Sequence, residues 1–225
     1  SKIGTSLFAK ADIKSVEDLK GKTIATGRPA AFLDATVRYV LRAKFGLMPD
    51  RDVKLLPTGE PYLGLQALER GVVDAAAMSI PHLFVARKAG FRELTSFDKL
   101  GIEYPYTSVV VLRQTAAKSP ELVERFVKCI VEGIYLFKTN KTKSLAALRR
   151  YMKGADEDIL EESYQHTRAT IDDAPHPSLQ VVKGGLEMLS LQYPQAKQTD
   201  ASLIIEPSFM KKIEESGFIK SLYKK

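Results

Sequence analysis

Residues 23–46 constrain the fold more than any other stretch of this sequence, because they predict a strand, a tight turn and a helix in direct succession. Thr23–Thr26 has the composition of a short strand, which Gly27, Arg28 and Pro29 interrupt. Apolar residues then recur at helical spacing and predict one buried helix face: Leu33, Val37, Val40 and Leu41. A strand that passes through a glycine turn directly into an amphipathic helix is typical of α/β proteins.

The start of this helix is a candidate anion site. Pro29 suits the first helical position, where a missing N–H costs nothing, and Gly46 suits the C-cap. Free N–H groups at Ala30, Ala31 and Phe32 would then favour a carboxylate, sulfonate or phosphate. Arg28 would add a guanidinium beside them. The alternative is an ordinary strand–helix corner with a surface arginine.

The alternation of strand and helix continues as far as Leu94. Strands are predicted over 52–56, 72–78 and 91–94, with helices over 62–70 and from Pro81 to Gly90. A further strand is expected over 6–9, and a one-turn helix capped by Ser15 over 15–21. This order predicts an α/β fold with a parallel or mostly parallel sheet.

The second half of the chain changes character. Residues 106–112, YTSVVVL, predict a buried strand, and amphipathic helices are expected over 119–137, 144–152, 156–170, 178–192 and 208–216. The first of these carries one apolar stripe: Leu122, Phe126, Ile130, Ile134 and Phe137. The single cysteine, Cys129, is expected to be buried and inert on the same side. Because amphipathic helices need a partner surface, either something outside this chain completes this half or the helices pack mainly on each other.

Composition and motifs exclude several classes of protein. Apolar residues make up 44% of the chain, but none of the apolar runs has the length of a membrane span, and no export signal occurs in these residues. The net charge of +7 comes without interleaved aromatics, so it indicates a solvated basic surface that suits an anionic small ligand and not a nucleic acid. The three histidines lack metal-ligand spacing, and phosphate-loop and dinucleotide motifs are missing, so no metal or cofactor is expected.

Three loops form the predicted site, since the carboxyl ends of parallel strands meet at one edge of a sheet. Each combines small or hydroxyl residues with a helix start, and together they offer hydroxyls, N–H groups and flat rings to a small polar or anionic molecule. The residues expected to bind are Thr26, Gly27, Arg28, Ala30, Ala31 and Phe32 in the first loop, Gly59, Glu60 and Tyr62 in the second, and Ser79 and His82 in the third.

Catalytic readings of the same sequence are weaker. The S-x-x-K match at 96–99 falls in a turn and lacks its companion motifs, so chance explains it better. Asp74 could serve as a general base, although such a residue more often anchors a loop. An enzyme would have to use His82, Glu60 or Asp74 as its reactive group.

Several segments together resemble bacterial periplasmic solute-binding proteins. Residues 14–22 (KSVEDLKGK) resemble their s-x-x-D-L-K-G-K segment, and residues 65–75 (LQALERGVVDA) look like A-L-x-x-G-x-V-D-A. Residues 119–126 (SPELVERF) resemble n-P-E-x-V-x-x-F, and residues 215–219 (ESGFI) also fit. The order and spacing cover nearly the whole chain and are closest to the NMT1/THI5-like family, which includes the sulfonate- and taurine-binding proteins of ABC importers.

This resemblance implies a periplasmic-binding-protein-like fold of type II, with two lobes that close on a ligand by hinge bending. It implies an α/β ligand-binding lobe over 12–103, with 1–11 and 104–225 forming hinge strands and the helical remainder of the other lobe. Family chains carry further strand–helix units before the position of Ser1, so the fold is expected to be N-terminally incomplete. The family's ligand loops match the three loops above and the start of the 106–112 segment, which adds Tyr106 and Thr107.

The expected function is therefore capture of a small anionic or polar molecule for an ABC importer, without catalysis. The expected partners are that ligand and the transporter permease, with membrane contact only through the permease or a lipid anchor outside this chain, and self-association through an exposed apolar face. The expected location is periplasmic or extracytoplasmic. Two alternatives stay open: a metabolic enzyme on the same fold, of the pyrimidine or menaquinone pathway type, and the ligand-sensing domain of a regulator. The cysteine-rich motif of the pyrimidine-synthesising relatives is absent from this sequence.

Overall fold

The computed structural model describes residues 4–102 and 104–224. The chain forms two compact units. The α/β unit comprises the described residues of 2–104 and 183–199, and the helical unit those of 105–182 and 200–225. The parts of the expected domain ranges at 1–3, 103 and 225 lie outside the described residues.

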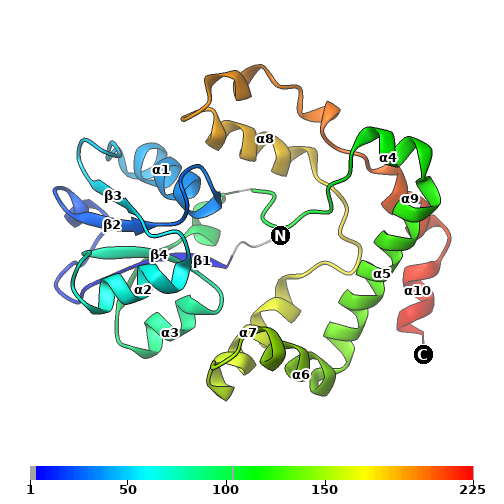
Figure 1. The fold of residues 1–225 in the computed structure, drawn as a ribbon, viewed down its shortest axis with the longest axis horizontal. Coiled ribbons are helices and arrows are strands. Elements are labelled where there is room, and N and C mark those ends of the chain that lie inside the picture. The colour runs from blue at the N-terminus through cyan, green and yellow to red at the C-terminus, as the bar shows by residue number, and fades with distance from the viewer. Residues whose placement is uncertain (1–3, 103, 225) are drawn as a thin grey trace. The chain divides into compact units, whose positions relative to one another are not determined.

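A five-stranded sheet organises the α/β unit (Figure 1). Its strands are β1 (Thr5–Ala9), β2 (Thr23–Thr26), β3 (Lys54–Pro57), β4 (Ala75–Ser79) and β5 (Arg92–Ser96). They lie in the order β3-β2-β4-β1-β5. β2 runs parallel to β3 and β4, whereas β1 is antiparallel to both of its neighbours, β4 and β5. The prediction of a mostly parallel sheet is confirmed, with β1 as the exception.

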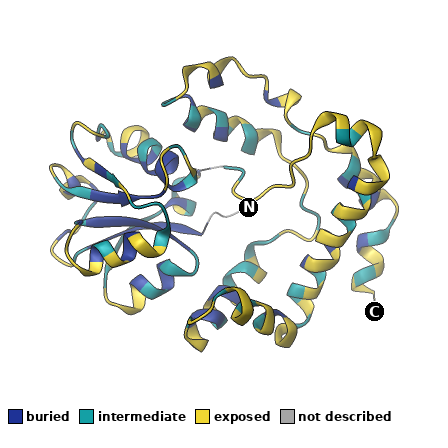
Figure 2. Ribbon diagram, viewed as in Figure 1, coloured by how far each residue is buried: buried dark blue, intermediate teal, exposed yellow. Residues whose placement is uncertain are grey.

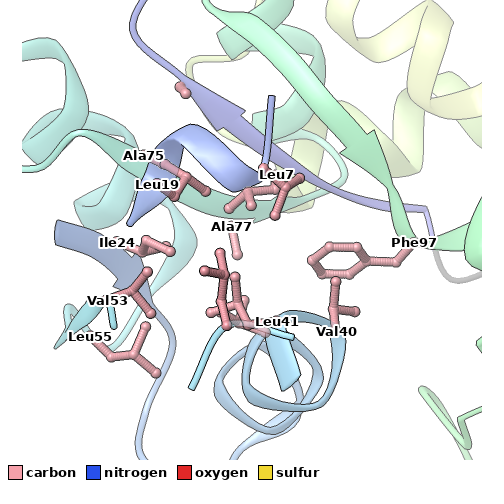
Figure 3. Packing of buried hydrophobic residues seen from close by; sticks show 14 of the residues in the cluster. Leu7, Leu19, Ile24, Val40, Leu41, Val53, Leu55, Ala75, Ala77 and Phe97 are labelled. Carbon is pink, nitrogen blue, oxygen red and sulfur yellow. The ribbon is translucent and has the colours of Figure 1, made fainter. Parts of the chain in front are cut away.

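Helices cover both faces of this sheet. α1 (Phe32–Phe45) packs on one face, and its predicted apolar stripe is buried, as are the strand residues Ile24, Ala75 and Ala77 beneath it (Figure 3). α2 (Pro61–Glu69) and α3 (His82–Lys88) follow β3 and β4. α2 packs on the other face, where a Cβ added to Gly64 would stand 3.5 Å from the Cβ of Ala25. The unit also contains two short 3-10 helices, η1 (Glu17–Leu19) before β2 and η2 (Phe97–Leu100) after β5.

Two predicted helix starts are wrong by a few residues. α1 begins at Phe32 and not at Pro29, because Ala30 adopts a left-handed conformation with φ of 60° and Ala31 is extended. Ser15 does not cap η1; the carboxylate of Asp18 instead accepts hydrogen bonds from the N–H groups of Lys14 and Ser15, each at 3.0 Å. The left-handed Ala30 shapes the turn before α1, and the carboxylate of Asp18 shapes the turn before η1.

The C-cap of α1 agrees with the sequence. Gly46 has φ of 67°, and its N–H bonds to the carbonyl of Leu41, as a helix-ending glycine requires.

The helical unit contains α4 (Arg113–Lys118), α5 (Pro120–Thr139), α6 (Lys141–Tyr151), α7 (Glu157–Thr170), η4 (Ala201–Leu203), α9 (Ser208–Glu215) and α10 (Phe218–Tyr223). α5 packs against α9 and α10 around a small core of Val131, Met210, Ile213 and Ile219. At its other end, the Phe137 ring lies 5.3 Å from the Tyr164 ring of α7, between ring centroids. Within the described residues, these helices pack on each other, as one of the two alternatives expects.

Part of this unit stays open to solvent. The strand predicted over 106–112 is wrong, because no strand occurs in residues 104–224. Residues 106–112 are exposed instead (Figure 2). Val110 is 85% and Leu112 75% exposed. On α5, Leu122 and Phe126 are about half exposed, and Cys129 is exposed and not buried. The apolar pattern is that of a strand covered on both faces, but strand formation needs a neighbouring strand, and none of residues 104–224 supplies one.

The boundary between the units also differs from the expected one. β1 belongs to the sheet of the α/β unit, although the sequence grouped residues 1–11 with the other lobe. Residues 183–199 return to the α/β unit as well, with the end of α8 (Leu179–Leu189) and η3 (Pro194–Gln198). Met188 enters its core there, and Tyr39 Oη donates a hydrogen bond to Glu187 Oε1 at 3.2 Å. The hinge role of these connections stays a prediction.

Candidate ligand-binding site

The three candidate loops lie at one edge of the sheet, as predicted. β2, β3 and β4 are parallel, and each loop follows the carboxyl end of its strand, with Thr26 opposite Pro57 in the register. Thr58 joins the first two loops, since its N–H and its hydroxyl both donate to the carbonyl oxygen of Thr26, at 3.0 and 2.8 Å. The loops after β2 and β3 are therefore held side by side.

Gly27 permits close packing in the first loop. It is buried, and a Cβ at this position would stand 3.1 Å from the Cβ of Leu33 and 3.8 Å from the carbonyl oxygen of Gly59. Gly59 itself has φ of 85°, a conformation that favours glycine. The two glycines let the loop after β2, the start of α1 and the loop after β3 approach one another.

Asp34 fixes the shape of the first loop, and sequence reasoning missed it. Its side chain is 1% exposed. Its carboxylate accepts hydrogen bonds from the Thr26 hydroxyl at 3.2 Å, the Ala30 N–H at 3.0 Å, Arg38 Nε at 3.1 Å and Gln192 Nε2 at 3.2 Å. A buried carboxylate with these four donors ties the strand end, the loop, the helix and the returning segment together. The sequence did contain a signal for this role: Asp34 is an acidic residue in the first turn of the helix that follows Thr26.

Two of the N–H groups expected to face a ligand have partners inside the loop. The N–H of Ala30 donates to Asp34, and the N–H of Ala31 donates to the carbonyl of Arg28 at 3.0 Å. Both donors therefore shape the turn that precedes α1. The charged and aromatic side chains of this edge are left as the main candidates for ligand contact.

Arg28 and Glu60 form an ion pair across the first two loops, a pairing that the sequence did not predict. Arg28 Nη2 bonds to Glu60 Oε1. The two side chains remain 72% and 46% exposed. The positive charge of Arg28, which was expected to bind an anion, is thus balanced by the carboxylate of Glu60 at the same edge of the sheet.

Aromatic groups complete the edge. Tyr62 is 48% exposed, and its ring centroid lies 6.4 Å from that of His82. Burial lowers the pKa of His82, against the opposing charge of Glu60, so the imidazole is neutral at pH 7. Its Nδ1 is buried and has no hydrogen-bond partner among the described residues. Phe32 packs on Tyr104 with 4.9 Å between ring centroids, and Ser79 is buried at the end of β4.

Two further candidates belong to the helical unit, and Asp74 lies at the opposite edge of the sheet. Tyr106 and Thr107 belong to the helical unit and are exposed, so their part in binding stays a prediction. Asp74 precedes β4, at the end opposite the loops, where its carboxylate accepts from the Thr23 N–H at 2.9 Å and pairs with Lys10 Nζ at 3.2 Å. These contacts favour the reading of Asp74 as an anchor over that of a general base.

A shallow hollow lies at that opposite edge, with a volume of about 340 Å³. It is lined by Gly21, which precedes β2, and by residues 50–54, which lead into the start of β3. Across residues 4–102 and 104–224, no group of three or more histidines, cysteines or acidic residues is placed to hold a metal ion. The helices of the same ranges are each too short or too polar to cross a bilayer.

The fold is that of the periplasmic binding proteins, and the chain belongs to the NMT1/THI5 like family, whose profile matches residues 3–141. A comparison with curated protein sequences finds no match.

Solved structures agree with this family. The periplasmic aliphatic sulphonate binding protein SsuA from Escherichia coli is similar with a TM-score of 0.71 and 20% identity, over 92% of this chain and 66% of that one. The alkanesulfonate-binding protein SsuA from Xanthomonas axonopodis pv. citri, bound to MOPS, gives 0.65 and 21%, over 92% and 67%. The desulfurization enzyme DSZB gives 0.58 and 14%, over 96% and 77%. The chain spans about two thirds of the length of the two SsuA proteins.

Proposed function

We propose that this protein is a solute-binding protein that captures a small anionic or polar organic molecule for ABC-type import. The observation that carries the proposal is the convergence of three strand-end loops at one edge of the sheet, with Arg28, Glu60, Tyr62 and His82 among them. In open α/β sheets, ligands bind at such edges. The similar sulfonate-binding structures support the same role.

In this proposal Arg28 binds the anionic group of the ligand, while Phe32, Tyr62 and Tyr106 provide apolar walls. The basic balance of the chain, +7, attracts an anion from a distance. The proposed location is the periplasm, the proposed partner is an ABC permease, and the proposed motion is a hinge between the two units.

The test is thermal unfolding against a panel of sulfonates, carboxylates, aromatic acids and pyrimidines. A ligand present at 100 times its Kd adds about 2.7 kcal/mol to the free energy of unfolding and raises the melting temperature. Arg28→Ala should abolish that rise. Arg51→Ala is the matched control, because Arg51 is 73% exposed and paired with Asp52 at the opposite edge. Loss of the rise in both variants, or in neither, would count against Arg28 as the anion site.

One observation favours a second candidate, an enzyme on the same fold. His82 has a buried Nδ1 without a hydrogen-bond partner among the described residues, and the desulfurization enzyme DSZB has a similar structure. Incubation of sulfinates, sulfonates and pyrimidines with the protein, followed by product analysis, tests this candidate. Turnover that His82→Ala abolishes and Arg51→Ala leaves unchanged would establish it.

A further inference from the structure

We infer that Gln192, a residue of the second half of the chain, is a positioning residue for the first of the three candidate loops. It acts through Asp34, and it holds in place the left-handed turn at Ala30. The inference rests on the proposed function, because residues 26–31 carry Arg28, the proposed anion-binding residue. It adds to the site a residue that lies 158 positions from Asp34 in the sequence.

The backbone of this loop has to be held from outside. Ala30 has φ of 60°, in the left-handed region that residues with a Cβ adopt only at a cost. Such a conformation persists where the surrounding structure fixes it. The Ala30 N–H donates to Asp34 Oδ2 at 3.0 Å, and the Ala31 N–H donates to the carbonyl of Arg28 at 3.0 Å. The shape of the turn therefore depends on where Asp34 Oδ2 lies.

Gln192 donates a hydrogen bond to that same oxygen. Its Nε2 lies 3.2 Å from Asp34 Oδ2, and the Asp34 side chain is 1% exposed, so little water reaches the carboxylate to replace the amide. The donors Thr26 and Arg38 belong to the strand and the helix on either side of the loop. Gln192 thus fixes the carboxylate from a different part of the chain.

The segment that carries Gln192 is itself fastened to the α/β unit. Met188 is 2% exposed within the core, and Glu187 accepts the hydrogen bond from Tyr39 of α1. The N–H of Gln192 donates to the carbonyl of Leu189 at 3.0 Å, which fixes the turn after α8. Gln192 therefore reaches the carboxylate from a backbone whose position is set by contacts outside the loop.

Hydrogen–deuterium exchange of the ligand-free protein, read by mass spectrometry on peptides of residues 26–32, tests the inference. Gln192→Met keeps the length of the side chain and removes its donor. The loop amides should then exchange about tenfold faster, because the loss of a hydrogen bond to a charged group costs roughly that factor. Peptides that cover β3 should change by less than about twofold. Gln195→Met, at an exposed position of the same segment, is the matched control and should change neither.

Ala30→Gly supplies a readout that a general stabilising role of Gln192 would not move. Glycine adopts φ of 60° without strain, so the turn no longer has to be held. In that background Gln192→Met should accelerate the exchange of residues 26–32 by less than about threefold. An acceleration of about tenfold in both backgrounds, an equal acceleration in β3, or no acceleration at all would overturn the inference.

Isothermal titration calorimetry with propane-1-sulfonate separates this inference from the proposed function. Gln192→Met should weaken the binding of this probe about tenfold, because the loop that carries Arg28 is then less often in its binding conformation. Unchanged affinity despite faster exchange of the loop would overturn the positioning role. If the unmodified protein does not bind the probe, the result counts against the proposed function, and the exchange experiment still decides whether Gln192 holds the loop.

Discussion

Replacing Asp34 with asparagine should destabilise the α/β unit strongly, although the change adds and removes almost no volume. The carboxylate is buried and accepts hydrogen bonds from four groups, among them the charged Arg38. An asparagine offers one acceptor oxygen and points its amide N–H₂ at groups that are themselves donors. The loop that carries Ala30 would lose the group that holds it.

The magnitude follows from the burial of the pair. Removal of one partner of a buried ion pair costs about 3–5 kcal/mol. Arg38 is 22% exposed and keeps its second partner, Asp50, at 2.5 Å, so the cost for Asp34→Asn should be lower, about 2–3 kcal/mol. For a chain of 225 residues this corresponds to a fall in melting temperature of about 4–12 °C.

Hydrogen–deuterium exchange under increasing urea, read by mass spectrometry on peptides of residues 23–45, measures this loss in the α/β unit separately from the helical unit. Asp50→Asn is the matched control. Asp50 contacts the same arginine but is 60% exposed, and its φ of 65° suits asparagine equally well, so its cost should stay below about 1 kcal/mol. A change below about 0.5 kcal/mol for Asp34→Asn, or equal costs for both variants, would refute the reasoning that burial sets the value of this pair.

Three further predictions concern packing, pH and exposure. Gly27→Ala should cost about 1–3 kcal/mol in urea unfolding because the new Cβ meets a helix side chain at 3.1 Å, whereas Gly133→Ala, with open space inside α5, should gain about 0.5–1 kcal/mol; equal effects would contradict the contact. Hydrogen bonds from two lysines lower the pKa of Glu124 from 4.5 to about 2, so its stabilisation is full above pH 4.5 and is lost as the pH falls toward 2. Glu124→Gln should remove that part of the acid dependence of urea midpoints, and an unchanged slope would speak against the pairing. Val110→Ser should change the free energy of unfolding by less than about 0.5 kcal/mol, since the residue is 85% exposed; a loss of 2 kcal/mol would mean that Val110 is buried in solution.

The local parts of the fold could be predicted from the sequence. The strand of residues 23–26, the buried stripe of α1 and the cap at Gly46 each depend on residues within one or two turns of each other. The common edge of the three loops followed from the alternation of strands and helices, because that order requires parallel strands.

The parts that failed depend on contacts between distant residues. The apolar run of 106–112 has the composition of a strand, but a strand also needs a neighbour, and composition says nothing about whether one is present. The return of residues 183–199 to the α/β unit rests on single contacts such as that of Gln192 with Asp34, which are 158 positions apart. No periodicity signals such a contact.

The sequence predicted which residues belong to the candidate site, but it did not predict how they pair. Arg28 and Glu60 were both expected to face the ligand, but as independent groups, since they stand 32 positions apart. Their ion pair follows from the register of β2 and β3, which the sequence leaves undetermined. The same register turns an expected anion site into a site with two charges.

The antiparallel β1 has a consequence for how the chain folds. It precedes its partners β4 and β5 in the chain, and their paired residues follow some 65 to 90 positions later. All five of its residues are buried in the folded sheet. During synthesis the segment therefore has no pairing partner in β4 until the chain has been made as far as residue 79. Long loops must close before such a strand gains its contacts, which slows folding and exposes the segment to association with other chains. A shortened chain that ends before β4 should therefore aggregate, whereas one that ends after β5 keeps every strand of the sheet.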